Sequence, residues 1–270
     1  MDLRRFVRGT IPWPKLERVA MELRRRYDRP QIRVEFLDAE NWLSTPCVVD
    51  EEFFVKIISP QNALVHAVFT GARNLGAVST GSPGFFEGFE GPYEMAVHDL
   101  EAMRQLREIG VNAPEPLEAF RVGDFGVVVL EFLPSFRTIE DLDTAEIAAR
   151  SPEVFAALSR MHEHHLVHGD LRGENILVYD DELYFIDVTK IRDGGIGEAA
   201  AYDLACALAE MAAHLGTRQA VDDAVSQYDI DRLLAARDFL DVVRLRPDHD
   251  FDAARVKGEI EMRASRAARR

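Results

Sequence analysis

The sequence HGDLRGENILVYDDELYFIDVTK, residues 168–190, decides the fold of this chain. Two runs rich in β-forming residues, 176–179 and 183–188, flank an Asp-Asp turn, so the stretch predicts a β-hairpin. Asn175 stands just before the first strand and Asp187 near the end of the second. Because the strands of a hairpin lie antiparallel, both side chains are expected at the same end of it.

Three oxygen-bearing side chains on this stretch point to its chemistry. Asn175 and Asp187 offer hard oxygen ligands of the kind that Mg²⁺ takes, and Asp170 is suited to accept a proton from an attacking hydroxyl. The alternative is a hairpin whose polar residues only cap one another, since tight turns prefer Asp, Asn and Gly in any case. The spacing favours phosphoryl transfer from a metal-bound nucleoside triphosphate.

The composition sets limits on the class of protein. A chain of 270 residues with 47% hydrophobic content can bury the core of one bilobal catalytic unit or of two small domains. A net charge of −15 argues against non-specific binding to nucleic acid or to an anionic membrane surface. Arginine supplies nearly all of the positive charge, and such an acidic, lysine-poor surface predicts a halophilic protein. The lack of a signal-like or membrane-spanning segment predicts a cytoplasmic location.

The amino-terminal half predicts a small sheet with helices. Residues 14–27 have the spacing of an amphipathic helix, and β-like runs follow at 32–37, 42–49 and 53–58. The tract STGSPGFFEGFEGP, residues 79–92, is rich in glycine and is expected to be a mobile loop. Together with a helix over 93–109, these elements are expected to form one lobe.

The second half is expected to be mostly helical. The apolar run 127–132 predicts a strand that ends at Leu133, where Pro134 takes the chain out of the sheet. Helices are expected at 141–149, 152–164 and 199–215, with amphipathic helices over most of the remainder. The predicted domains are therefore a helical extension over 1–30, an N-lobe over 31–133 and a C-lobe over 134–270.

Lys56 lies in the middle of the β-run FFVKII, where a buried ammonium group needs an anionic neighbour. We interpret it as the group that holds the α- and β-phosphates of the nucleotide. The helix register, counted back from the glycine that follows the helix, favours Asp99 as its partner over Glu94 and Glu101. The alternative is a lysine on a solvated face of the sheet.

Some polar residues leave two interpretations open. The turn Asp-Ala-Glu-Asn, residues 38–41, occupies the place of a phosphate-covering loop but contains no glycine. Ser44 or Thr45 could add hydroxyl groups there, and a plain surface hairpin explains these residues equally well. Arg172 can neutralise phosphoryl charge or bridge to Glu174 at the surface.

Asp203 can accept hydrogen bonds from backbone amides of the 168–175 loop or be an ordinary helix carboxylate. The histidines at 162, 164, 165 and 168 do not predict a zinc site, because neighbours two apart on a helix point in different directions.

Together these segments resemble the protein-kinase superfamily, and most closely the RIO family of atypical kinases with the related Bud32-type kinases. HGDLRGENIL resembles the family loop H-[AG]-D-L-x-x-x-N-I-L, and IDVTK resembles its strand end I-D-V-S-Q. Leu-Asp-Ala-Glu-Asn resembles the family's G-x-E-A turn, with Asp38 in place of the glycine. The resemblance implies an α+β, bilobal protein-kinase-like fold, with a small antiparallel sheet and helix in the N-lobe and the catalytic hairpin in a mostly helical C-lobe.

The resemblance also implies a site that binds ATP with Mg²⁺. It assigns catalytic roles to Asp170, Lys56 and Asp187, metal binding to Asn175 and Asp187, and adenine binding to backbone groups near Glu131 and Leu133. It further implies that Asp187 can itself be phosphorylated during an ATPase cycle that acts on ribosome maturation. Asp99 then takes the place of the carboxylate that steadies the lysine, one methylene shorter than the usual glutamate.

The sequence thus predicts an ATP-dependent serine/threonine kinase or ATPase of the RIO type, acting on an unknown protein or small-molecule acceptor and bound to a pre-ribosomal particle. A first alternative is a small-molecule phosphotransferase of the aminoglycoside or sugar kinase type, against which the Val188-Thr189-Lys190 sequence counts. A second is a pseudokinase that only binds partners, motivated by the glycine-free turn and by Asp99.

Overall fold

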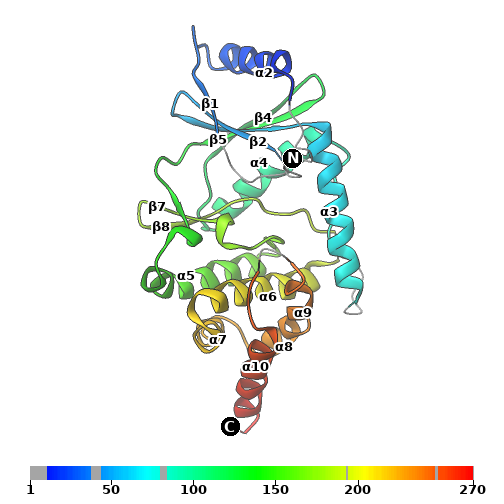
Figure 1. Ribbon diagram of the computed structural model, residues 1–270, viewed down its shortest axis with the longest axis vertical. Helices are drawn as coiled ribbons and strands as arrows, with labels where there is room; N and C mark the ends of the chain where they lie inside the picture. Colours follow the sequence, from blue (N-terminus) through cyan, green and yellow to red (C-terminus); the bar gives the residue numbers. More distant parts are fainter. Residues whose placement is uncertain (1–10, 38–43, 80–83, 193, 247–248, 270) are drawn as a thin grey trace. The chain divides into compact units, whose positions relative to one another are not determined.

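The computed structural model describes residues 11–37, 44–79, 84–192, 194–246 and 249–269, which form two compact units (Figure 1). Unit 1 comprises Met1–Gly71, Gly88–Gln105 and Pro114–Pro134, and unit 2 comprises Ala72–Glu87, Leu106–Ala113 and Ser135–Arg270. This division differs from the domains predicted from sequence in two ways. The helical extension predicted over 1–30 is part of unit 1, and unit 2 takes two short segments from earlier in the chain.

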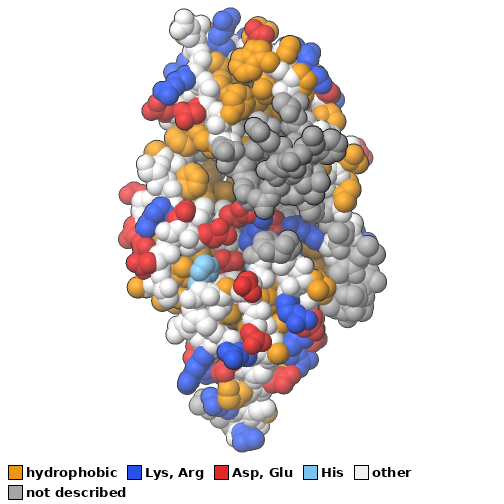
Figure 2. Space-filling view, in the orientation of Figure 1, with side chains coloured by type: hydrophobic (Ala, Val, Ile, Leu, Met, Phe, Trp, Pro, Cys, Tyr) orange, Lys and Arg blue, Asp and Glu red, His pale blue; other side chains and the backbone are white. Residues whose placement is uncertain are grey.

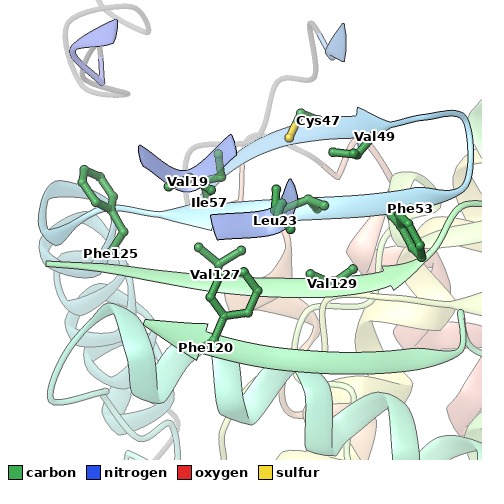
Figure 3. Close-up of a cluster of buried hydrophobic side chains, with 11 residues drawn as sticks. Val19, Leu23, Cys47, Val49, Phe53, Ile57, Phe120, Phe125, Val127 and Val129 are labelled. Atoms are coloured by element: carbon green, nitrogen blue, oxygen red, sulfur yellow. The ribbon is translucent and has the colours of Figure 1, made fainter. Parts of the chain in front are cut away.

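Unit 1 contains a five-stranded antiparallel sheet with the strand order β1-β2-β3-β5-β4. Its strands are β1 Val34–Phe36, β2 Thr45–Val49, β3 Phe53–Ile58, β4 Pro116–Val122 and β5 Phe125–Glu131. Helix α2, Trp13–Arg26, covers one face, where its Val19 and Leu23 pack into a buried cluster with Ile57 and Val127 of the sheet (Figure 3). The expected helix near the amino terminus is therefore part of the core of unit 1.

In each of two helices, the chain passes from one unit to the other part of the way along the helix. Helix α4, Pro92–Glu108, matches the predicted helix, whereas α3, Pro60–Ser79, was not predicted. Its apolar periodicity is weak, but its start carries a recognisable signal. The backbone N–H of Ser59 donates to Asn62 Oδ1 at 2.9 Å and the N–H of Asn62 donates to Ser59 Oγ at 3.2 Å, so the two residues cap the first turn reciprocally.

Unit 2 combines a three-stranded sheet, in the order β6-β7-β8, with helices. The strands are β6 Arg137–Thr138, β7 Ile176–Tyr179 and β8 Glu182–Phe185; the helices are α5 Thr144–Glu163, α6 Ile196–Leu215, α7 Thr217–Val225, α8 Ile230–Arg237, α9 Leu240–Val243 and α10 Ala253–Ala267; two 3₁₀ turns lie at Ile139–Asp141 and Gly173–Asn175. Helix α6 is buried along most of its length and packs against α5, α7, α8 and α9.

Two details of unit 2 bear on the sequence predictions. The helices expected at 141–149 and 152–164 are one helix, α5, which continues through Pro152 because Ile147, Phe155 and Leu158 bury one side of it. The hairpin β7–β8 turns at Asp180 and Asp181, whose φ angles of 49° and 66° match the two-residue turn that suits the twist of paired strands.

Acidic and basic side chains of the described residues are interspersed on the face that Figure 2 shows. Within the described residues, none of the helices combines the length and apolar character needed to cross a bilayer.

Candidate functional site

In unit 1, Lys56 is buried and ion-paired. Its Nζ lies 2.9 Å from Oδ2 of Asp99 on α4, and the two side chains are 5% and 14% exposed. The pair predicted from the helix register is therefore present, and the alternative of a solvated lysine is wrong. Glu101, which was considered as the partner, instead pairs with Arg104 on the exposed side of α4.

The residues expected to contact adenine also lie in unit 1. The backbone N–H of Glu131 donates to the carbonyl of Glu115 at 2.8 Å, and its carboxylate accepts the N–H of Glu115 at 3.0 Å. Leu133, just beyond β5, is buried. The amide of Glu131 is thus already used by the sheet, which limits what it can offer to a ligand.

The expected phosphate-covering turn, residues 38–41, lies outside the described residues. Ser44, which follows it, is buried, and its Oγ has no hydrogen-bond partner among the residues that the structure describes. Thr45 is half-buried at the start of β2. A buried hydroxyl of this kind costs free energy unless it gains a partner, so Ser44 is the stronger of the two candidates for a ligand contact.

In unit 2, the 168–175 loop is held by Asp203, a fully buried residue of α6. Its carboxylate accepts the backbone N–H groups of His168 and Gly169, each at 2.6 Å. The prediction that Asp203 binds amides of this loop is confirmed. Gly169 has φ of 78°, and a Cβ there would lie 2.8 Å from the Thr189 side chain, so the turn requires glycine.

Backbone hydrogen bonds join this loop to the end of the hairpin. The N–H of Ile186 donates to the Asn175 carbonyl at 3.1 Å, and the N–H of Thr189 donates to the His168 carbonyl at 2.7 Å. Asp187 lies between these two contacts in the left-handed region, with φ of 63°, a conformation that is strained for a non-glycine residue. The loop and the segment that carries Asp187 are therefore fixed to each other.

The donor set of Asn175 and Asp187 fits a hard divalent cation. The Asn175 amide nitrogen donates to the Asp170 carbonyl at 2.8 Å, which leaves its side-chain oxygen as the acceptor available to a metal ion. Asp187 supplies a half-buried carboxylate on the neighbouring segment. Among the described residues, no group of three or more His, Cys, Asp or Glu side chains is arranged to hold a metal ion.

Asp170 is surrounded by arginines that the sequence did not predict. Its Oδ1 accepts hydrogen bonds from Arg73 of α3 and, at 2.8 Å, from Arg246, which follows α9. Arg172 Nε lies 3.5 Å from Oδ2, and its guanidinium group also forms the predicted pair with Glu174. Its neutralisation of phosphoryl charge stays a prediction. Burial alone would raise the pKa of Asp170, but the three guanidinium groups lower it well below its usual range. The carboxylate is therefore ionised and enclosed.

The glycine-rich tract contributes to the same unit. Phe86 forms a β-bridge with Ile191, just after the segment that carries Asp187, and Phe85 and Phe86 are almost fully buried. The Asn74 side chain accepts the N–H of Phe86 and donates to its carbonyl, each at 2.9 Å. The expectation of a mobile loop is wrong for this part of the tract, because two aromatic side chains anchor it.

Comparisons with known proteins give three kinds of match. A family model described as the RIO domain matches residues 93–193, a range that includes Asp99, Asp170, Asn175 and Asp187 but not Lys56. The KEOPS complex subunit Bud32 of Pyrococcus abyssi is 29% identical over 97 residues, which cover 35% of this chain and 43% of that protein. The EKC/KEOPS complex subunit BUD32 of Debaryomyces hansenii is 26% identical over 127 residues, covering 40% and 47%.

The chain thus spans less than half the length of each of these relatives. Among solved structures, the Mycobacterium tuberculosis PknI kinase domain is 12% identical with a TM-score of 0.42, over 87% of this chain and 96% of that one. Its C20A mutant is 13% identical with a TM-score of 0.40, over 86% and 95%.

Proposed function

We propose that the chain is a RIO/Bud32-like atypical kinase, and that it is an ATP- and Mg²⁺-dependent phosphotransferase that acts as a serine/threonine protein kinase or as an ATPase. The observation that carries the proposal is the 168–175 loop, which Asp203 holds through two short amide hydrogen bonds. If the polar residues of this turn only capped one another, no carboxylate from a distant helix would be required. Burying such a charge costs free energy unless it is hydrogen-bonded, and here its hydrogen bonds fix the 168–175 loop.

In this proposal Lys56 holds the α- and β-phosphates, and Asp99 keeps its ammonium group in place. Asn175 and Asp187 hold Mg²⁺, which neutralises phosphate charge when it is bound. The hydrogen bond from Asn175 to the Asp170 carbonyl ties the metal ligand to the residue that receives the acceptor hydroxyl. Most of the rate then comes from positioning and charge neutralisation rather than from covalent chemistry.

Asp170 is better suited to orient the acceptor hydroxyl than to take up its proton, because arginines hold the pKa of its carboxyl well below the usual range. Adenine contacts are assigned to the backbone near Glu131 and Leu133. Since the N–H of Glu131 is engaged by Glu115, the donor to adenine has to come from a residue further along the chain.

The relatives bear on the partners of the protein. Both curated relatives are named as subunits of KEOPS complexes, so we favour a protein partner in an assembly of that kind. Neither name mentions a pre-ribosomal particle, which was the partner expected from the sequence. The cytoplasmic location and the halophilic origin stay predictions from composition.

The proposal is tested by isothermal titration of the whole chain with Mg·ATP, followed by turnover of γ-labelled ATP. Asp187→Ala is expected to abolish metal-dependent nucleotide binding, whereas Asp170→Ala keeps binding and loses turnover. Asp231→Ala, an exposed residue in the first turn of α8, is the matched control for loss of a carboxylate. No binding at millimolar Mg·ATP leaves only the pseudokinase, and full turnover by Asp170→Ala refutes the assigned mechanism.

The same labelled sample separates the kinds of acceptor. Acid-stable label on the protein or on a partner indicates a hydroxyl acceptor, and hydroxylamine-labile label indicates an acyl phosphate such as one on Asp187. Release of free phosphate without either product indicates an ATPase.

A further inference from the structure

Helix α2 carries a charge opposite in sign to that of the whole chain. It has five basic and two acidic residues, whereas the chain has 32 basic and 47 acidic residues. Arg25 and Arg26 are used within the helix, since both pair with Glu22. Arg18 and Arg24 are exposed, and neither forms an ion pair with a residue that the structure describes. A local excess of positive charge on an acidic protein favours the approach of an acidic partner to this helix.

The same helix exposes two large apolar side chains. Trp13 is 69% exposed and Met21 is 53% exposed. With 3.6 residues per turn, Met21 lies opposite Val19 and Leu23, the two side chains that pack on the sheet. We call the outer face of α2 the exposed side formed by Trp13, Glu17, Arg18, Met21, Arg24 and Arg25. Tryptophan, methionine and arginine are enriched in protein interfaces and glutamate is depleted there, so this composition is typical of a binding surface.

Two ion pairs fix α2 to the hairpin formed by β4 and β5. Lys15 Nζ lies 3.0 Å from Oδ2 of Asp124 in the turn of the hairpin, and Arg26 pairs with Glu118 of β4 at 2.6 Å. The charge of Arg18 also acts on Asp124 from farther away. Because the helix is fixed, its outer face is presented in one orientation, and less conformational entropy is lost when a partner binds.

We propose that the outer face of α2 is a docking surface for an acidic partner protein. In the complex, carboxylates of the partner pair with Arg18 and Arg24, and apolar side chains of the partner cover Trp13 and Met21. Two copies of this chain joined through the same face would bring like charges together, so the surface fits a different protein. Nucleic acid offers phosphates and flat bases, whereas the thioether of Met21 fits an apolar pocket of a protein.

The inference goes beyond the proposed function and does not rest on it. Helix α2 lies outside residues 93–193, which the RIO family model matches, and it contains none of the residues proposed to bind ATP or Mg²⁺. The partner is therefore expected to bind with or without nucleotide.

The test measures binding of three labelled polymers to the full chain by fluorescence anisotropy, without nucleotide and in one buffer of low KCl concentration. A copolymer of glutamate and tyrosine stands for an acidic protein segment with apolar side chains. Polyglutamate supplies the charge alone, and a single-stranded oligothymidylate stands for nucleic acid. Sedimentation of the chain by itself, over a range of concentrations, measures self-association.

We expect the copolymer to bind more tightly than polyglutamate or the oligothymidylate. The variants Trp13→Ser, Met21→Ser and Arg24→Gln should each weaken copolymer binding by about fivefold or more, as for residues at the centre of an interface. The controls are Met262→Ser, an exposed methionine of α10, and Arg244→Gln, an exposed arginine that forms no ion pair with a described residue. Thermal unfolding of every variant shows that it is folded.

A second measurement locates the bound polymer. Trp13 and Trp42 are the two tryptophans of the chain, so Trp42→Phe leaves Trp13 as the single tryptophan. Its fluorescence should change as the copolymer binds, because an exposed indole ring passes from water into an apolar contact. The change should follow the same binding curve as the anisotropy.

Other results overturn the inference. Equal copolymer affinity in wild type and in the folded α2 variants means that the polymer binds elsewhere, and no copolymer binding by the wild type removes the docking surface. Equal affinity for polyglutamate means that charge alone attracts the polymers. Tighter binding of the oligothymidylate, lost in the same variants, assigns the face to nucleic acid, and self-association abolished by these variants assigns it to a second copy. Failure to bind Mg·ATP refutes the proposed function alone, since no titration here contains nucleotide.

Discussion

Replacing Asp203 with alanine is expected to destabilise unit 2 strongly. The carboxylate accepts two backbone N–H groups, from His168 and Gly169, at 2.6 Å each, and is completely buried. A hydrogen bond to a charged group contributes about 1.5–3 kcal/mol, so the loss of two predicts about 3–6 kcal/mol. Both amides would then be buried without an acceptor. Since whole domains are stable by only about 5–15 kcal/mol, the variant should lose a large part of its free energy of unfolding.

Asp203→Asn gives a graded test of the same contacts. Asparagine has one acceptor oxygen, so it can serve one amide while its NH₂ group faces the other donor, and about half of the alanine effect is expected. Urea unfolding followed by circular dichroism measures both variants. The control is Asp238→Asn, because Asp238 is exposed and pairs with Arg237 at the surface. If Asp203→Asn unfolded at the same urea concentration as the wild type, Asp203 would not be what holds the loop.

Further predictions concern charge. Lys56→Met should weaken Mg·ATP binding and lower the free energy of unfolding by about 3–5 kcal/mol, because it leaves the carboxylate of Asp99 partly buried without its cation. Calorimetry and urea unfolding measure the two effects, and the control Lys15→Met, which removes only the pair of half-buried Lys15 with Asp124, should change neither appreciably. Burial would raise the pKa of Glu210, but the imidazoles of His214 and His249 outweigh it and lower that pKa from 4.5 to about 2. A lowered folded-state pKa adds stability that is complete above about pH 4.5 and is lost as the pH falls towards 2, so Glu210→Gln should flatten the stability curve in that window. With a net charge of −15, stability in urea should rise from low to molar KCl, and a flat or falling curve would reject the halophile hypothesis.

The parts of the fold that follow local rules were predictable from sequence. Strand β3, Phe53–Ile58, and strand β7, Ile176–Tyr179, have the predicted bounds, because each is a short run rich in β-forming residues and is bounded by turn residues. Asp99 was found by counting helix register, which works because α4 is regular up to its end. Strand β4, Pro116–Val122, was missed because it begins with proline and mixes polar and apolar residues at the edge of the sheet.

Helix α3 was missed for a different reason. Its sequence is mildly apolar throughout and includes Gly71, so no apolar stripe identifies it, and only the reciprocal cap of Ser59 and Asn62 marks its start. That signal is short and common, and a glycine-rich tract follows within twenty residues. A weak local signal next to a strong contrary one therefore gave no prediction of a helix here.

The arginines around Asp170 show where sequence reasoning stops. Arg73 is 97 residues before Asp170 and Arg246 is 76 residues after it, and neither belongs to a motif. Arginine is common in this chain, which has 32 basic residues, so composition does not single out these two. What distinguishes them is burial against one carboxylate, and burial follows from packing that no local pattern encodes. The motif therefore predicts a reaction, whereas the arginines that enclose Asp170 come from outside the motif and are found only from the packing of unit 2.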